Sequence, residues 1–216
     1  MRIRSFIIAY ALLLAILLFA DRRPNPGSQQ NRYSHIVDLT AATNPGVEHP
    51  SASPRTQIIA PDAMIPGTWT AGQIPPERLI APLVVMDLNI AAPAQISLDD
   101  VATWEAAHGS IPAGAVVAIR NRNAANAPSD TPLPITDDAA QFLMDARYTL
   151  GFAVESAADL KADRPLARQL ALHGDFVVQQ TARLSAIPAT GSLIVVAPAK
   201  ERNAGTASVR VLAMVK

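Results

Sequence analysis

The chain has 216 residues and a mass of 22.8 kDa, which suits one domain of ordinary size or one domain with a short appendage. Half of the residues are hydrophobic and 17% are charged, a composition that excludes a wholly disordered chain. The 18 basic and 18 acidic residues cancel, which argues against nucleic acid as a partner, and the absence of cysteine excludes disulfides, zinc–thiolate sites and thiol nucleophiles.

The first 32 residues differ in composition from the rest. Arg2 and Arg4 precede an apolar run over residues 6–20 (FIIAYALLLAILLFA), which polar residues follow. A helix of this run would reach about 22 Å, short of the roughly 30 Å of a bilayer core and suited to the core of a signal peptide. We expect residues 1–20 to be a signal anchor or signal peptide and residues 21–32 to be a polar linker. The body, residues 33–216, would then be membrane-anchored or exported, with the periplasmic or other extracytoplasmic side favoured.

Short β-rich runs are spread through the body. Several are apolar at consecutive positions, as expected of strands that are buried on both faces. The predicted strands cover residues 35–40, 83–90, 115–120, 151–155, 175–179, 193–197 and 208–215.

Three helices are predicted between these strands, each opened by a residue typical of a helix N-terminus. Along the first helix, Leu98, Val101, Trp104 and His108 would share one face. Alternating strands and helices predict an α/β fold with a mixed or parallel sheet. The helices open near Ser97, Thr136 and Pro165, and Gly109 and Gly174 can end the first and third.

The segment 44–76 is rich in Pro, Gly, Ser and Thr and has no sustained periodicity. A segment of this length in a compact domain is usually functional or a flexible cover. Trp69 lies in it and could either pack or stack on a ligand.

Several short sequence motifs occur in a fixed order along the body, and each alone is weak evidence for a family. They are HIVDLT (35–40), IPPERLIAPLVVMDL (74–88), ISLDDVATWEAAHGSIPAGAVVAIR (96–120), FVVQQTARLSAIPATG (176–191) and ASVRVLAMV (207–215). Together they resemble the cyclase family, whose best-known members are kynurenine formamidases. The resemblance implies a mixed β-barrel-like sheet flanked by helices, usually in dimers or larger oligomers. For active relatives it also implies hydrolysis of an amide or a similar bond at a divalent metal.

The chemistry of this family rests on a signature of the form H-x-G-T-H-x-D-x-P-x-H. Imidazoles and a carboxylate at that spacing supply nitrogen and oxygen ligands to zinc or manganese. The metal lowers the pKa of bound water and produces a hydroxide near neutral pH. A further histidine and glutamate handle the proton.

Residues 53–63 align with this signature, but most of its functional side chains are replaced. Thr56 and Pro61 are retained, whereas the positions of the three histidines, the aspartate and the glycine carry other residues. In chain order the replacements are Ser53, Arg55, Gln57, Ile59 and Ala63.

Other family positions are changed as well. Ala167 stands where a Pro-x-His step has its histidine, Gln179 where a glutamate is found, and Ala153 where an aspartate is found, while Ser156 matches a family serine. The scaffold phrases are intact beside these losses, which indicates an emptied active site without a metal cofactor. Glu155 and Asp159 are expected to pair with Arg164 or Arg168 at the surface rather than to act in catalysis.

A relocated metal site would have to use His49 and Asp62. One histidine and one carboxylate on a loop make a poor site, because zinc takes three or four protein ligands. The other histidines have structural interpretations: His35 opens a strand, and His108 and His173 lie in last helical turns, where a cation suits the helix dipole.

The favoured hypothesis is a non-catalytic member of the family that keeps the fold for small-molecule binding or assembly. In its pocket, Arg55 would favour an anion. The expected pocket-lining residues are Ser53, Arg55, Thr56, Gln57, Ile59, Ala63, Trp69, Ala167 and Gln179. The alternative is an active metal-dependent amide hydrolase of the arylformamidase type that uses unrecognised ligands such as His49 and Asp62. A third possibility is a structural subunit in a mixed oligomer with an active paralogue, as opposed to a homo-oligomer.

Overall fold

The computed structural model describes residues 33–41, 55–88, 95–121, 132–161, 164–201 and 203–216. All of them belong to one unit, residues 33–216. The predicted membrane segment and the linker, residues 1–32, lie outside the described residues and stay predictions. Within the described ranges no helix combines the length and the apolar character that crossing a bilayer requires.

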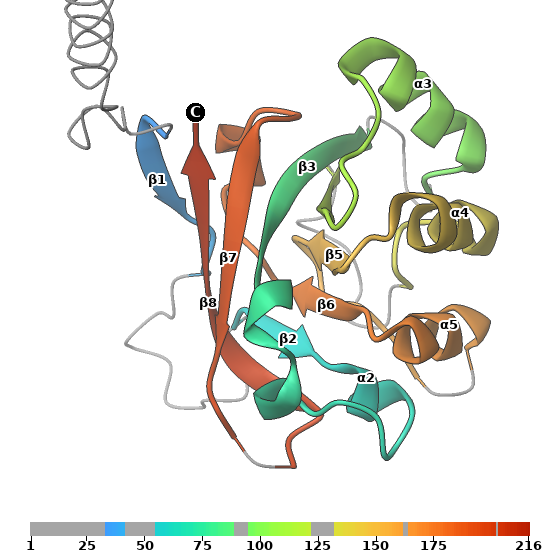
Figure 1. The fold of residues 1–216 in the computed structure, drawn as a ribbon, viewed down its shortest axis with the longest axis vertical. Helices are drawn as coiled ribbons and strands as arrows, with labels where there is room; N and C mark the ends of the chain where they lie inside the picture. Colours follow the sequence, from blue (N-terminus) through green and yellow to red (C-terminus); the bar gives the residue numbers. More distant parts are fainter. Residues whose placement is uncertain (1–32, 42–54, 89–94, 122–131, 162–163, 202) are drawn as a thin grey trace, which may run out of the picture. The chain divides into compact units, whose positions relative to one another are not determined.

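The described strands form one mixed sheet that closes into a barrel (Figure 1). Their order is β1-β8-β2-β6-β5-β4-β3-β7, and β8 also pairs with β7, which closes the ring. Neighbours among β3, β4, β5 and β6 run parallel, whereas the remaining pairs are antiparallel. The strands are β1 (His35–Asp38), β2 (Gln57–Ile59), β3 (Ile80–Leu88), β4 (Val116–Asn121), β5 (Gly151–Val154), β6 (Phe176–Gln179), β7 (Ser192–Pro198) and β8 (Thr206–Val215).

Consecutive apolar residues occur where a strand has a core on both faces. Val116 and Ala118 of β4 belong to the core inside the barrel, whereas Val117 and Ile119 face the core between the sheet and the helices. By contrast, successive residues of β8 alternate between buried and exposed or half-buried, because one face of the strand meets solvent. The predicted mixed sheet flanked by helices is therefore confirmed.

Three helices connect the parallel strands in turn and lie together on one side of the sheet (Figure 1). They are α3 (Leu98–His108), α4 (Asp137–Arg147) and α5 (Pro165–His173). α3 begins with a capping box: Ser97 Oγ accepts the N–H of Asp100 at 3.2 Å, and the Asp100 carboxylate accepts the N–H of Ser97 at 2.9 Å. α5 begins at Pro165 and is closed by Gly174 in the left-handed region, at φ 74°. All three predicted helices are confirmed.

The predicted apolar face of α3 is only partly correct. Val101 is buried, and the indole N–H of half-buried Trp104 donates to the carbonyl of Val85 at 3.1 Å. Leu98 is 39% exposed and His108, which stacks on Trp104, is also exposed. Only the middle of this helix reaches the sheet.

The segment 44–76 contains structure that its sequence pattern did not predict. Residues 57–59 form β2, and α2 (Pro61–Met64) follows directly. A three-residue strand is too short to show an alternating pattern, and this one is held by pairing with β6 on one side and β8 on the other. The prediction of an irregular segment was wrong here, whereas residues 44–54 lie outside the described residues.

Candidate functional site

Two family positions whose residues are replaced, one in the signature and one outside it, lie opposite each other in the sheet, and both carry glutamine. The register of β2 and β6 places Gln57 beside Gln179, at the carboxyl edge of the parallel strands, where α/β proteins usually bind ligands. Gln179 Nε2 donates to Gln57 Oε1 at 3.1 Å, and Gln179 Oε1 accepts the N–H of Ala158 at 2.9 Å. The resemblance implies a histidine and a glutamate at these positions. A neutral amide pair, joined by a hydrogen bond, stands there instead.

Thr56, which the signature retains, joins its own segment to the backbone of two others through its hydroxyl. Its buried hydroxyl donates to the carbonyl of Gln180 at 2.7 Å and accepts the N–H of Ala41 at 2.7 Å. The side chain of Arg55 is exposed, and its backbone N–H donates to Gln180 Oε1 at 3.1 Å. Gln180 itself has a positive φ of 56°, a conformation that costs energy for a residue with a Cβ. The backbone around the former site is therefore tightly constrained.

The other described signature positions carry no donor for a metal. Ile59 is 7% exposed and belongs to the core beneath the helices, and Ala167 is fully buried in the same core. Ala63 is exposed in α2. Ser53 lies outside the described residues.

These residues do not fit the divalent metal that the resemblance implies. A zinc site needs three or four nitrogen, sulfur or carboxylate donors, and an amide oxygen is a weak substitute for them. In the described part of the chain, no group of three or more His, Asp or Glu side chains is arranged to hold a metal ion. Asp62, the weak alternative ligand, accepts the N–H of Gly67 at 2.8 Å and so closes its own turn, and its proposed partner His49 lies outside the described residues.

A charged group that the sequence analysis missed lies at the same edge of the sheet. Arg120, near the end of β4, forms an ion pair with Asp87 of β3. Glu155, directly after β5, lies within electrostatic reach of both, and burial raises the pKa of its carboxyl against the opposing charge of Arg120. Glu155 thus neighbours Arg120 rather than the expected Arg164 or Arg168.

Asp159 pairs with Arg164, as predicted, but in a different environment. Arg164 Nη2 lies 2.7 Å and Nε 3.2 Å from Asp159 Oδ2. The aspartate is only 9% exposed, so the pair is not simply a surface pair. The hydrogen bond from Arg164 lowers the pKa of Asp159 and keeps the carboxyl ionised.

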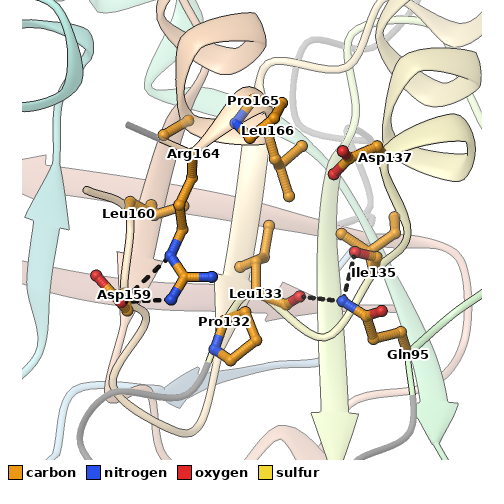
Figure 2. A pocket seen from close by; sticks show the side chains of 11 residues that line it. Gln95, Pro132, Leu133, Ile135, Asp137, Asp159, Leu160, Arg164, Pro165 and Leu166 are labelled. Atoms are coloured by element: carbon orange, nitrogen blue, oxygen red, sulfur yellow. Dashed lines mark hydrogen bonds and ion pairs between the residues drawn. The ribbon is translucent and has the colours of Figure 1, made fainter. Parts of the chain in front are cut away.

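This ion pair lies beside a cavity of about 220 Å³ at the start of α5, which we call the α5 cavity (Figure 2). Ala167, the position of a family histidine, is part of its wall. Gln95, Asp137 and Arg164 supply polar groups around it, while its other lining residues are mainly apolar: Pro132, Leu133, Ile135, Leu160, Pro165 and Leu166. The cavity therefore adjoins the emptied site.

Trp69 lines a second, more open pocket of about 370 Å³ at the other end of α5. Its indole ring packs near Gly174, and the guanidinium of Arg78 lies 5.5 Å from the ring centroid. This pocket contains Pro61 of the signature stretch, whereas Ala167 lines the α5 cavity. The structure thus places Trp69 and Ala167 in different pockets.

Arg78 also reaches a buried carboxylate behind Trp69. Its Nη2 donates to Asp175 Oδ1 at 3.1 Å and to the carbonyl of Gly174 at 3.0 Å. Asp175 is 1% exposed, and this burial raises its pKa to about 7, against the lowering effects of Arg78 and of the Thr149 hydroxyl. The pair joins the turn after α5 to the segment before β3.

The remaining histidines occupy structural positions. His35 opens β1 and its Nδ1 lies 2.8 Å from the hydroxyl of Ser34. His108 Nδ1 lies 3.0 Å from the carbonyl of Trp104, and His173 Nε2 lies 3.2 Å from Asp145 Oδ1. All three are exposed.

Comparison with known structures supports the fold described above. Isatin hydrolase A from Labrenzia aggregata bound to benzyl benzoate aligns with a TM-score of 0.69 and 23% identity, over 96% of this chain and 99% of that one. Isatin hydrolase A from Ralstonia solanacearum aligns with a TM-score of 0.67 and 23% identity, over 96% and 97%. A structure described as a potential metal-dependent hydrolase with cyclase activity aligns with a TM-score of 0.64 and 24% identity, over 83% and 96%.

Comparison of sequences points to the same relatives. The chain is 29% identical over 162 residues to an isatin hydrolase of Roseibium aggregatum, and the alignment covers 64% of this chain and 61% of that protein. The family described as "Putative cyclase" matches residues 37–158, which is more than half of the chain. The chain therefore belongs to the cyclase family.

Proposed function

We propose that this chain is a non-catalytic member of the cyclase family that keeps the fold in order to bind a small molecule beside the former metal site. The observation that carries the proposal is the Gln57–Gln179 hydrogen bond. The two amides bond to each other, Gln179 also accepts from the backbone N–H of Ala158, and neither side chain is charged at any pH that the fold would encounter, so the pair is a poor ligand for a cation.

The apolar replacements support the same conclusion. Hydrolysis of an amide by a metal-bound hydroxide needs ligands that fix the ion and lower the pKa of its water. Ile59, Ala63 and Ala167 hold neither lone pairs nor charge. The α5 cavity, by contrast, offers a concave surface that combines apolar side chains with a few polar groups, as small-molecule sites do.

The test is hydrolysis of formanilide, an N-formyl aromatic amine, by the purified full chain in the presence of Zn²⁺ or Mn²⁺. We expect no release of aniline above the rate that the metal alone produces. A saturable rate that depends on the protein, disappears with EDTA and returns on addition of metal would overturn the proposal.

Two histidine variants distinguish an unrecognised active site in this chain from a contaminating hydrolase. His49→Ala removes the histidine that the alternative hypothesis needs, whereas His108→Ala removes an exposed histidine of α3 and serves as the matched control. A rate that is lost in the first variant and kept in the second would establish the alternative, an active amide hydrolase.

A further inference from the structure

The open pocket at the C-terminal end of α5, which Trp69, Gln73 and Leu172 help to line, is called the Trp69 pocket below. It forms where the turn after α2 meets α5, two helices that lie side by side (Figure 1). Among the described signature positions, Pro61 alone contributes to it. A ligand of this pocket would therefore be independent of the metal chemistry of the family.

Trp69 is open to solvent and yet held in position. It is 40% exposed, and its backbone carbonyl accepts the N–H of Asp62 at 3.0 Å. Its ring lies against Gly174, where an added Cβ would come within 3.0 Å of Trp69 Cζ3. The guanidinium of Arg78 also lies on the ring, 5.5 Å from its centroid. An aromatic surface that is fixed in advance loses little conformational entropy when a ligand covers it, which favours binding.

Polar atoms around this ring have hydrogen-bonding capacity left. Gln73 Oε1 accepts the backbone N–H and the hydroxyl of Thr70, both at 3.0 Å, whereas Gln73 Nε2 has no acceptor in the described part of the chain. The indole N–H of Trp69 likewise has no acceptor among the described residues. The hydroxyl of Thr68 donates to the carbonyl of Ile65 at 2.7 Å, and its oxygen can still accept a hydrogen bond. The pocket therefore combines an aromatic surface with two unused donors and an acceptor.

The lining offers no counter-ion to a charged ligand. Of the described residues that line the pocket, His173 alone can carry a charge, and its Nε2 lies 3.2 Å from Asp145 Oδ1. The guanidinium of Arg78, beside the ring, is bonded to Asp175. A charged ligand would lose hydration without gaining a partner, so the pocket favours a neutral one. Other charged residues on the surrounding segments have both signs, namely Asp62, Glu77, Arg168 and Glu201.

A pyranose sugar matches these features better than an aromatic ligand or a proline-rich peptide does. Its axial C–H groups form an apolar face that packs on the negative face of an aromatic ring, and its hydroxyls both donate and accept. An aromatic hydrocarbon would cover the indole but leave the two donors without partners, which costs free energy. Proline rings bring carbonyl acceptors but no donor for Thr68. The pocket volume of about 370 Å³ lies within the range of small-molecule sites, which begins at roughly 300 Å³.

We propose that the Trp69 pocket binds a neutral carbohydrate, a role that goes beyond the proposed function and uses a different pocket. A pyranose ring stacks on the indole of Trp69. Hydroxyls of this ring or of a linked sugar accept from Trp69 Nε1 and Gln73 Nε2, and one hydroxyl donates to Thr68 Oγ1. Leu172, which is 67% exposed, extends the apolar surface of the pocket.

Three probes, each added to the purified full chain, separate the ligand classes. Cellobiose offers rigid pyranose faces with hydroxyls, sorbitol offers hydroxyls without a ring, and acetyl-pentaproline amide offers rings and acceptors without hydroxyls. Binding is measured by ligand-observed NMR and by tryptophan fluorescence. We expect cellobiose to bind saturably with a Kd below about 10 mM, and at least tenfold more tightly than the other two probes. No saturation by cellobiose, equal binding of sorbitol, or equal or tighter binding of the peptide would overturn the proposal.

Substitutions in the pocket locate the site. Trp69→Ala should weaken cellobiose binding at least tenfold, whereas Leu98→Ala, which removes a similarly exposed apolar side chain from α3, should not change it. Gln73→Glu keeps an acceptor for Thr70 but removes the amide donor, and it should weaken binding at least threefold, as should Leu172→Ala. If Trp69→Ala does not fold, these two variants at exposed positions decide. Cellobiose binding that is unchanged in every folded variant of the pocket would place the ligand elsewhere and overturn the proposal.

This test is independent of the test of catalysis, because the Trp69 pocket and the α5 cavity share no described lining residue. A protein that binds cellobiose as expected and also hydrolyses formanilide would contradict the lack of catalysis and leave the carbohydrate site intact. A protein that does neither would contradict the carbohydrate site and leave the lack of catalysis intact.

Discussion

A variant in which the three described signature ligands and the two proton-handling positions are restored is expected to bind one Zn²⁺ or Mn²⁺ per chain, with a Kd below about 1 µM. The changes are Gln57→His, Ile59→Asp, Ala63→His, Ala167→His and Gln179→Glu. The reason is that the chain keeps the family fold, so donors at these positions should converge as the family resemblance implies. In the natural chain two amides, one isoleucine and two alanines stand there.

The free energy of unfolding, measured without metal and then with it, tests this prediction. Ile59 is 7% exposed, and an aspartate there has few partners until a cation binds, so the metal-free variant should lose about 3 kcal/mol of unfolding free energy. Metal at a hundred times its Kd should then return about 2.7 kcal/mol, seen as a rise in Tm.

The matched control for this variant carries Ile59→Asn in place of Ile59→Asp and should gain much less from metal, because it lacks the central negative charge. If metal leaves the Tm of the fully restored variant unchanged, the five positions do not form a common site, and the assignment of the emptied site is incorrect.

The second large effect concerns the buried pair behind Trp69. Arg78→Met is expected to lower the unfolding free energy by about 3 kcal/mol at pH 8, because it leaves the Asp175 carboxylate buried without its cation. At pH 5 the loss should be about 1 kcal/mol, since Asp175 then carries a proton in the folded state and the charge is absent. Urea unfolding at the two pH values measures both losses.

The sign of this pH dependence follows from linkage. The folded pKa of Asp175, about 7, is higher than the 3.8 of an ordinary aspartate, so the folded state binds the proton more tightly. The stability contributed by this group is complete below about pH 4 and is lost as the pH rises through 7. Asp175→Asn should remove this part of the pH dependence.

Arg210→Met is the matched control, because the Arg210–Asp38 pair is exposed and should contribute less than about 1 kcal/mol. An equal loss for Arg78→Met at pH 5 and pH 8 would show that Asp175 does not titrate between these values.

The strands and helices that obey local rules could be predicted from the sequence. The apolar run of β4 is buried on both faces, and the capping box at Ser97 and the pair Pro165 and Gly174 place the ends of α3 and α5 within one residue. These signals depend on neighbours along the chain, which a sequence displays directly.

The parts that could not be predicted depend on contacts between distant segments. β2 is a strand because β6 and β8 pair with it, and its three residues carry no pattern of their own. The Arg78–Asp175 pair joins residues that are 97 positions apart. The resemblance identified Gln57 and Gln179 as replacements of family site residues, but the hydrogen bond between them and the cavity beside Ala167 could be seen only in the fold.

The central claim is that the metal ligands of the family have been exchanged for groups that hold no cation. It is tested most directly by the metal content of the full chain, purified without chelator, incubated with equimolar Zn²⁺ or Mn²⁺ and dialysed. We predict much less than one equivalent of metal per chain in elemental analysis. One equivalent of either ion, retained through dialysis and released by EDTA, would contradict this account.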